Sequence, residues 1–207
     1  MRPGEGGCTL PQQRPGWLVD FRQLFAYHCE SNSILPNEEP SMISESLLPE
    51  FDQEMANTRK VLERVPAAKF SWKPHPKSFD FGSLAAHIAN MPDWAGLTMQ
   101  ADSFDYAPPG APPYETPKFS STEQLVAVFD ESVAEERAAL VAADDSKFLA
   151  PWSLMAGGKT MMTMPRVAVI RSFVMNHTIH HRAQLGVYLR LNDIPVPALY
   201  GPTADEQ

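Results

Sequence analysis

The chain has 207 residues, of which 43% are hydrophobic and 20% charged, and its formal net charge is −8 at pH 7. This composition is typical of a globular protein, and the negative charge excludes a binder of nucleic-acid phosphates, which needs clustered Lys and Arg. No window of the sequence reaches the roughly 18 consecutive apolar residues of a membrane-spanning helix. We therefore expect a cytoplasmic protein that binds neither a nucleic acid nor a membrane.

The first 41 residues differ in composition from the rest of the chain. They are rich in Pro, Gly, Asn and Ser and lack the apolar stretch of a signal peptide. We interpret residues 1–41 as an N-terminal extension, either upstream sequence translated ahead of a native start at Met42 or a native but poorly ordered arm. The domain is then expected at residues 42–207. Both cysteines of the chain, Cys8 and Cys29, lie in the extension, so thiol chemistry in the domain would need an external thiol.

The first half of the expected domain contains two helical patterns. Apolar residues at mixed three- and four-residue spacing predict a helix over about 44–65, with Ser44 as its N-cap. A second helix is predicted over about 82–103, where Pro92 indicates a kink or a local irregularity. The proline-rich "YAPPGAPPYETPKFSS" that follows predicts a long surface connection rather than a helix.

The second half predicts two more helices and one irregular segment. A third helix is expected over about 122–143, and "PWSLMAGGKTMMTM" predicts a short hairpin or irregular loop around Gly157 and Gly158. The fourth helix starts near Pro165, which suits a first-turn position, and runs to about Asn192. Four helices with one long second-to-third connection predict an all-α fold, a four-helix bundle.

Three histidines fall within five positions of the fourth predicted helix. At roughly 100° per residue, His177, His180 and His181 lie on the stripe that contains Leu185 and Tyr188, which is expected to face the interior. The spacing of His177 and His181 (i, i+4) suits two ligands of one metal ion, although His180 at i+3 leaves the pair open.

The second predicted helix brings a fourth histidine, His87, which shares an inward stripe with Leu84, Met91 and Trp94. Burying several imidazoles without a shared partner is unfavourable, and a divalent cation would offset that penalty. Hydrogen-bonded core histidines remain the alternative interpretation at this point.

Three stretches of the sequence resemble motifs of the DinB-like family of four-helix-bundle metalloproteins. They are "WKPHPKSFDFG", "FGSLAAHIANMPDW" and the long, specific "NHTIHHRAQLGVYLRLNDIPVPALYGPTADE", and the resemblance covers residues 42–207. It implies one divalent metal ion, nickel or zinc, bound by His87, His177 and His181, with His180 as a neighbour that does not ligate. Three protein ligands leave a coordination position open for water or substrate. Some relatives are transferases or isomerases that use thiols such as bacillithiol or mycothiol.

Several further residues are candidates for supporting roles. Gln184 lies one turn beyond His181 and is expected to orient a ligand or to contact substrate, or else to be a satisfied core residue. Asn90 and Trp94, one and two turns beyond His87, are candidate substrate-binding residues. Arg182 falls off the histidine stripe and is expected in a salt bridge or a subunit contact. Arg166, roughly 16 Å from His177 by helical rise, is not expected to contact substrate.

These observations favour a metal-dependent enzyme with a small-molecule substrate. The sharpest prediction is a thiol-dependent S-transferase that conjugates a small electrophile, in which the metal would lower the pKa of the external thiol. One alternative is a hydrolase that uses metal-bound water without any thiol, and another is a non-catalytic metal- or ligand-binding stress protein. A homodimer through an exposed apolar helix face is also expected.

Overall fold

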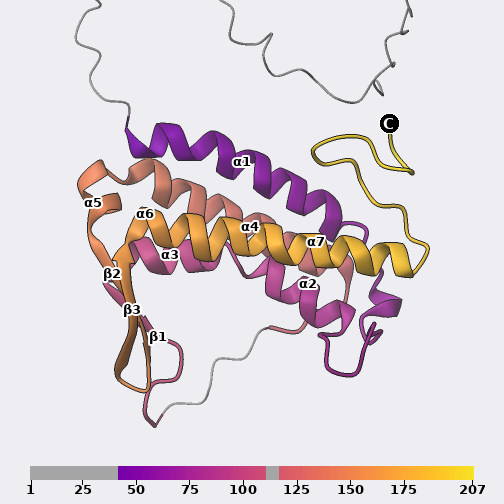
Figure 1. Cartoon of the computed structure of the whole chain (residues 1–207), viewed down its shortest axis with the longest axis horizontal. Helices are drawn as coiled ribbons and strands as arrows, with labels where there is room; N and C mark the ends of the chain where they lie inside the picture. Colours follow the sequence, from indigo (N-terminus) through magenta and orange to yellow (C-terminus); the bar gives the residue numbers. More distant parts are fainter. Residues whose placement is uncertain (1–41, 111–116) are drawn as a thin grey trace, which may run out of the picture. The chain divides into compact units, whose positions relative to one another are not determined.

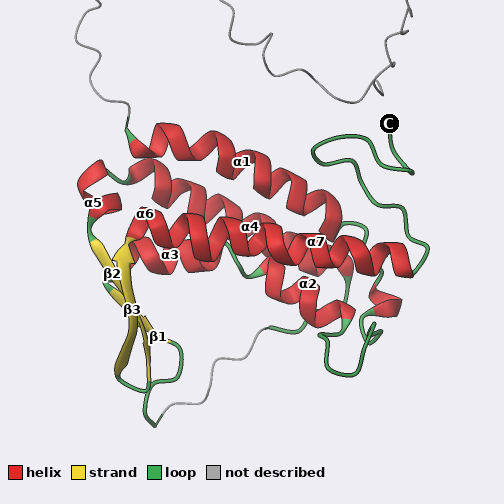
Figure 2. Ribbon diagram, in the orientation of Figure 1, coloured by secondary structure: helices red, strands yellow, loops and turns green. Residues whose placement is uncertain are grey.

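The computed structural model describes residues 42–110 and 117–207, and the predictions for residues 1–41 lie outside this part of the chain. Figures 1 and 2 show how the helices and strands are arranged. In chain order they are α1 (Ile43–Leu62), the 3₁₀-helix η2 (Ala67–Lys69), α2 (Phe81–Ala89), α3 (Asp93–Gln100), β1 (Ser103–Asp105), α4 (Thr122–Ala142), α5 (Asp145–Leu149), β2 (Pro151–Ala156), β3 (Lys159–Pro165), α6 (Arg166–Val169), the π-helical η3 (Ile170–Met175) and α7 (Asn176–Leu191). Within the described residues, no helix is both long and apolar enough to cross a membrane.

The helices pack around one apolar core. Helix α1 packs against α4 and α7, α2 against α7 and α4, and α3 against α4 and η3. Fully buried side chains such as Leu47, Phe51, Leu125 and Leu185 come from α1, α4 and α7 and meet in this core. The described chain is therefore mostly helical, as predicted.

A small sheet departs from the strictly all-α prediction, which is not confirmed in that form. Strand β2 pairs antiparallel with β3 and parallel with β1, and the sheet lies at the end of the helices next to α5 (Figure 2). The predicted turn at Gly157 and Gly158 is confirmed as a hairpin, in which both glycines have positive φ (59° and 76°). Asp105 at the end of β1 accepts hydrogen bonds from both glycine N–H groups, at 3.1 and 2.7 Å. This carboxylate thus joins β1 to the hairpin.

Two predicted helix ends are wrong. Ser44 is not an N-cap, because α1 begins one residue earlier and the N–H of Ile43 donates to Oδ1 of Asp145 at 2.7 Å. A carboxylate from α5, distant in sequence, thus satisfies the helix end that a local side chain was expected to satisfy. The second predicted helix, expected to about residue 103, ends at Gln100, since Ser103–Asp105 form β1 beside β2 instead of another helical turn.

Pro92 divides the second predicted helix into two separate helices. Helix α2 ends at Ala89, α3 begins at Asp93, and the side-chain amide of Asn90 donates to the carbonyl of Ala86 at 2.7 Å. Proline cannot donate the next helical hydrogen bond, so the local irregularity predicted from the sequence is confirmed as a full break.

The fourth predicted helix is continuous over nearly the expected range but is not uniform. Residues Ile170–Met175 form π turns between α6 and α7, directly before His177. A π turn uses i→i+5 hydrogen bonds and so changes the rotational phase of the residues on either side. A helical wheel drawn for a straight α-helix therefore does not carry across this segment.

Two buried arginines hold the C-terminal helices in place. Arg182 of α7, 2% exposed, donates to Oε2 of Glu54 (2.6 Å) and to the Glu54 carbonyl (2.9 Å) on α1, and Tyr200 binds the same carboxylate at 2.6 Å. This is the salt bridge expected for Arg182. Arg166, 1% exposed, donates to the carbonyls of Thr98 and Pro151 at 2.8 and 3.0 Å, which is a structural role.

We predict that Arg182→Ala destabilises the protein by about 3–5 kcal/mol, because it leaves the buried Glu54 carboxylate without its cation. The matched control is Arg137→Ala, which breaks an exposed pair with Asp52 and should change stability far less, because solvent screens that pair. Urea unfolding of both variants in the presence of a chelator measures the difference. Equal losses in the two variants would contradict the prediction.

Candidate metal centre

Helix α2 presents His87, and local interactions set the direction of this helix. The Asp80 carboxylate caps it by accepting the N–H of Ser83 at 2.7 Å. Gly82 lets α2 approach the preceding segment, since a Cβ at this position would lie 2.9 Å from the Cβ of Phe70. The His87 ring stacks on Phe79, with 6.0 Å between centroids and 25° between planes. Phe79 thus packs along one face of the imidazole.

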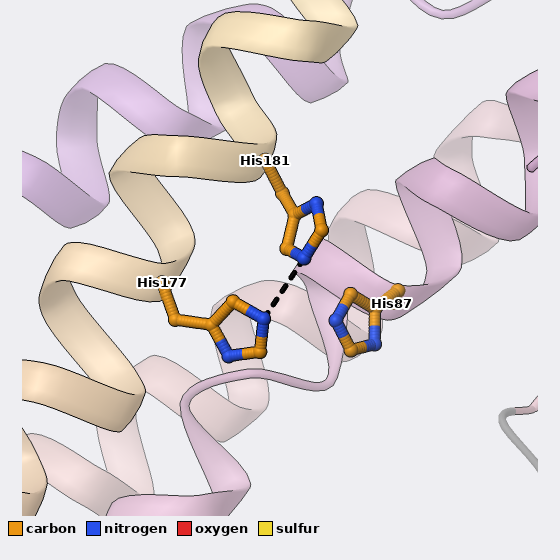
Figure 3. A group of neighbouring side chains, drawn as sticks. All are labelled: His87, His177 and His181. Carbon is orange, nitrogen blue, oxygen red and sulfur yellow. Dashed lines mark hydrogen bonds between the residues drawn. The ribbon is translucent and has the colours of Figure 1, made fainter. Parts of the chain in front are cut away.

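Helix α7 turns two of its three histidines toward His87. The Nε2 atoms of His177 and His181 lie 2.8 Å apart. The ring centroid of His87 lies 5.3 Å from that of His177 and 4.7 Å from that of His181. One ligand atom from each of the three residues lies within 4.8 Å of the others. Figure 3 shows the three rings gathered at one point between α2 and α7.

His180 lies outside this group. Its side chain is exposed, and its Nε2 contacts the side-chain amide of Gln184 at 3.1 Å. The sequence left open whether His180 or His181 accompanies His177. In the structure only His177 and His181, at i and i+4, face α2.

The second nitrogen of each α7 imidazole has its own hydrogen-bond acceptor. Oε1 of Gln184 lies 2.7 Å from Nδ1 of His181, so Nδ1 carries the proton and the Nε2 lone pair faces the other histidines. The ring of His177 is hydrogen-bonded to the backbone of Phe173, one turn earlier. Such partners orient metal-ligating histidines and fix their tautomers.

Burial keeps the three imidazoles neutral. Desolvation, followed by the nearby His181 and His177, lowers the pKa of His87 to about 4. Desolvation is also the main cause of the lowered pKa values of His177 and His181. Neutral imidazoles are the form that binds a metal ion, so no proton competes for these lone pairs at neutral pH.

The chemistry of the donors fits a borderline transition-metal ion. The group consists of three imidazoles and contains no carboxylate, and imidazole nitrogens suit zinc and nickel, whereas oxygen ligands suit magnesium and calcium. Three neutral ligands leave the full positive charge of a divalent ion uncompensated. They also leave at least one coordination position of the ion open for water or substrate. His87, His177 and His181 can therefore hold a metal ion.

Comparison with known proteins identifies the family. A family model described as the DinB superfamily matches residues 50–185. The chain belongs to the DinB superfamily. Two solved structures share its fold. A DinB-like protein from Bacillus cereus is 19% identical with a TM-score of 0.61, and the match covers 77% of this chain and 98% of the other. A DinB-like protein, YjoA, from Bacillus subtilis is 16% identical with a TM-score of 0.57, covering 76% and 99%. No curated protein matches the chain.

In this DinB-superfamily chain, the side chains of Asn90 and Trp94 make contacts that do not involve the three histidines. Asn90 is 6% exposed and bonds to its own helix, and Trp94 packs edge-on against Phe104 with 5.4 Å between centroids. Neither residue lines the hollow beside His87 described next. Their assignment as substrate-binding residues stays a prediction.

A hollow of about 420 Å³ opens beside His87. Its walls include Phe70, Phe79 and Phe119, and the charged Lys118 lines it as well. This volume suits a small ligand, and its largely apolar lining is common in small-molecule sites. The sequence analysis missed these residues, because the only signal was an excess of aromatic residues in two proline-broken loops.

We predict that the metal-free protein loses stability as the pH falls from about 6.5 to 4. His87 stays neutral in the fold down to a pKa of about 4, whereas in the unfolded chain it takes up a proton near its ordinary pKa of 6.5. The unfolded state thus binds more protons in this window, and stability decreases toward acid pH.

Urea midpoints measured in chelator at several pH values provide the test. The curve of His87→Leu should be flatter than that of the parent over the same window. His75→Leu, which changes an exposed loop histidine, is the control and should follow the parent. A His87→Leu curve parallel to the parent would contradict the prediction.

Proposed function

We propose that His87, His177 and His181 bind one divalent metal ion, nickel or zinc, and that the protein is a thiol-dependent S-transferase acting on small electrophiles. The observation that carries this proposal is that one residue, His87, belongs both to the three-imidazole group and to the wall of the adjacent hollow. A ligand in that hollow would lie beside the open side of the metal site.

We further propose that residues 42–207 form a single DinB-type four-helix bundle. Its four members would be α1, α2 with α3, α4, and α6 through α7. The small sheet would then be an addition at one end. The exposed Val187 and Leu191 on α7, 57% and 59% exposed, offer an apolar surface through which two such chains could pair as a homodimer.

Hydrogen bonds with neighbouring residues would keep His177 and His181 in the tautomers that can bind a metal ion. Gln184 accepts the Nδ1 proton of His181 and so keeps its Nε2 free to ligate. The backbone at Phe173 does the same for His177. When bound, a divalent ion would supply a Lewis acid that lowers the pKa of a thiol, so that the nucleophilic thiolate forms at neutral pH.

The hollow would hold the second reactant. Phe70, Phe79 and Phe119 would pack against an apolar electrophile and exclude water, and Lys118 would attract a carboxylate of the thiol cosubstrate. The thiol would release its proton as the thiolate forms. The thiolate sulfur would then bond to the electrophilic carbon while the bond to the leaving group breaks, and the leaving group would depart with the electron pair of that bond. The described part of the domain contains no cysteine, which supports an external thiol.

We predict that purified parent protein carries close to one metal ion per chain and that the Ala variants of His87, His177 and His181 lose it. His180→Ala should keep it, because that ring lies outside the group. Gln184→Ala should bind metal about 10–100-fold more weakly, since it removes a partner that orients a ligand. Elemental analysis and metal titration make these measurements. If His180→Ala also lost its metal ion, that result would contradict the ligand assignment.

We predict that the metal-loaded protein conjugates a model electrophile only when a low-molecular-weight thiol is added. Product formation by mass spectrometry with bacillithiol, mycothiol or glutathione, compared with no thiol, is the measurement. His87→Ala serves as the inactive control. Turnover without thiol would support the hydrolase alternative, and absence of turnover under every condition would support the metal- or ligand-binding stress protein.

A further inference from the structure

A second hollow lies between α3 and α4, away from the histidine group. It measures about 320 Å³, and its walls include Trp94, Phe104, Ser132 and Glu136. It shares no lining residue with the hollow beside His87. Nothing in the proposed transferase reaction uses this second site.

The carboxylate of Glu136 is buried in this hollow without a partner. The residue is 1% exposed, and neither Oε1 nor Oε2 has a hydrogen bond in the structure. A Cβ built on Gly96 of α3 would lie 3.5 Å from Oε2, so the carboxylate faces bare backbone where a side chain would otherwise stand. A buried carboxyl group normally has hydrogen-bond partners, and its lack here indicates a place for a ligand.

A second buried carboxylate in the described part of the chain, that of Glu54, does have partners. Glu54 of α1, 6% exposed, is satisfied by Arg182 and Tyr200. The charged residues that line the hollow at Glu136 are all acidic, namely Asp93, Glu135 and Glu136 itself. The protein thus supplies an internal cation for one buried carboxylate and none for the other. An ionised Glu136 would therefore need a cation from outside the chain.

The walls of the hollow indicate what kind of cation fits. Trp94 and Phe104 pack edge to face at 76°, and aromatic rings attract organic cations. A metal ion would need several ligand atoms close together, and in the described residues only the three histidines form such a group. A carboxylate beside a pair of aromatic rings is an arrangement that suits an organic ammonium ion.

We propose that the hollow between α3 and α4 binds a small organic ammonium ion, with the Glu136 carboxylate accepting its N–H groups and Trp94 and Phe104 contacting its hydrocarbon part. The polar side chains of Ser132 and Gln100 line the same space and offer further hydrogen bonds. The site is separate from the proposed metal centre, so it stands or fails independently of the transferase.

Binding at this site releases a proton. Burial, followed by the charge of Asp93, raises the pKa of Glu136 to about 8, so the carboxyl group is largely protonated in the empty protein at pH 7. The other acidic side chain facing the hollow is Glu135, and its charge adds to the attraction for a cation. An arriving ammonium ion favours the ionised form of Glu136. Affinity should therefore rise with pH toward 8 and fall only when the amine loses its own proton, near pH ~10.

The test is calorimetric titration of the full chain with benzylamine and n-butylamine, with benzyl alcohol as the neutral control. We expect benzylamine or n-butylamine to bind at least tenfold more tightly than benzyl alcohol. Repeating the titration at pH 7 in buffers of different ionisation enthalpy should show proton release. Glu136→Gln, which has nearly the shape of the protonated acid, should bind at least tenfold more weakly and release no proton. Its thermal midpoint verifies that it is folded.

Two further variants complete the experiment. Glu131→Gln removes the same charge from an exposed position on α4 outside the hollow and should bind like the parent. Gly96→Ala puts a methyl group against Glu136 and should weaken binding without unfolding the protein. If neither amine binds more tightly than benzyl alcohol, or if Glu136→Gln binds as the parent does, the proposal is overturned and Glu136 is a buried, protonated acid without a ligand.

Discussion

The buried ion pair between Arg182 and Glu54 fixes the rotation of α7, and the histidine group depends on that rotation. Successive residues of an α-helix point about 100° apart, so His181 and its neighbour Arg182 must face different partners. Because Arg182 is held on α1 by the carboxylate and the backbone carbonyl of Glu54, His181 is turned toward α2. A small rotation of α7 would break the ion pair and separate the imidazoles together.

The π turns of η3 allow a second arginine to meet its own partners on the same continuous helix. On a straight α-helix, Arg166 would return to within about 20° of His177, on the stripe that faces α2. In the structure Arg166 instead binds the carbonyls of Thr98, at the end of α3, and of Pro151, at the start of β2. The wider turns between residues 170 and 175 change the phase between these positions. His177 therefore faces α2, whereas Arg166 contacts α3 and β2.

The parts of the molecule that the sequence predicts are those set by local chemistry. Apolar spacing predicts α1, α4 and the fourth helical run, and Pro92 predicts a kink or local irregularity. Spacing also places several histidines on inward stripes, and the resemblance to the DinB-like family singles out His87, His177 and His181, which the structure brings together. The features that the sequence does not predict depend on partners that are distant along the chain. Asp145 caps α1 from another element, and β1 is a strand only because β2 lies beside it. The hollow beside His87 is formed by loops whose conformation no periodicity encodes.

Glu136 illustrates the same limit within a regular helix. It follows Phe129 and Ser132 on the buried stripe of α4, so helical spacing alone places a carboxylate in the interior. Spacing does not say whether that carboxylate has a partner, and Glu54, on the buried stripe of α1, has one. The difference depends on which residue faces each carboxylate. Arg182 extends from α7 toward Glu54, whereas α3 presents Gly96 to Glu136.

The break at Pro92 is what allows one segment of the chain to serve both places. Helix α2 packs against α7 and directs His87 to the other imidazoles, while α3 packs against α4, places Gly96 next to Glu136 and brings Trp94 to the wall of the same hollow. A continuous helix could not change direction between these two contacts. The side-chain amide of Asn90 adds a second hydrogen bond to the Ala86 carbonyl at the end of α2, and Pro92 has no N–H to continue the helical pattern. The residue that interrupts the helical pattern thus separates the group of three neutral imidazoles from the buried, unpartnered carboxyl group of Glu136.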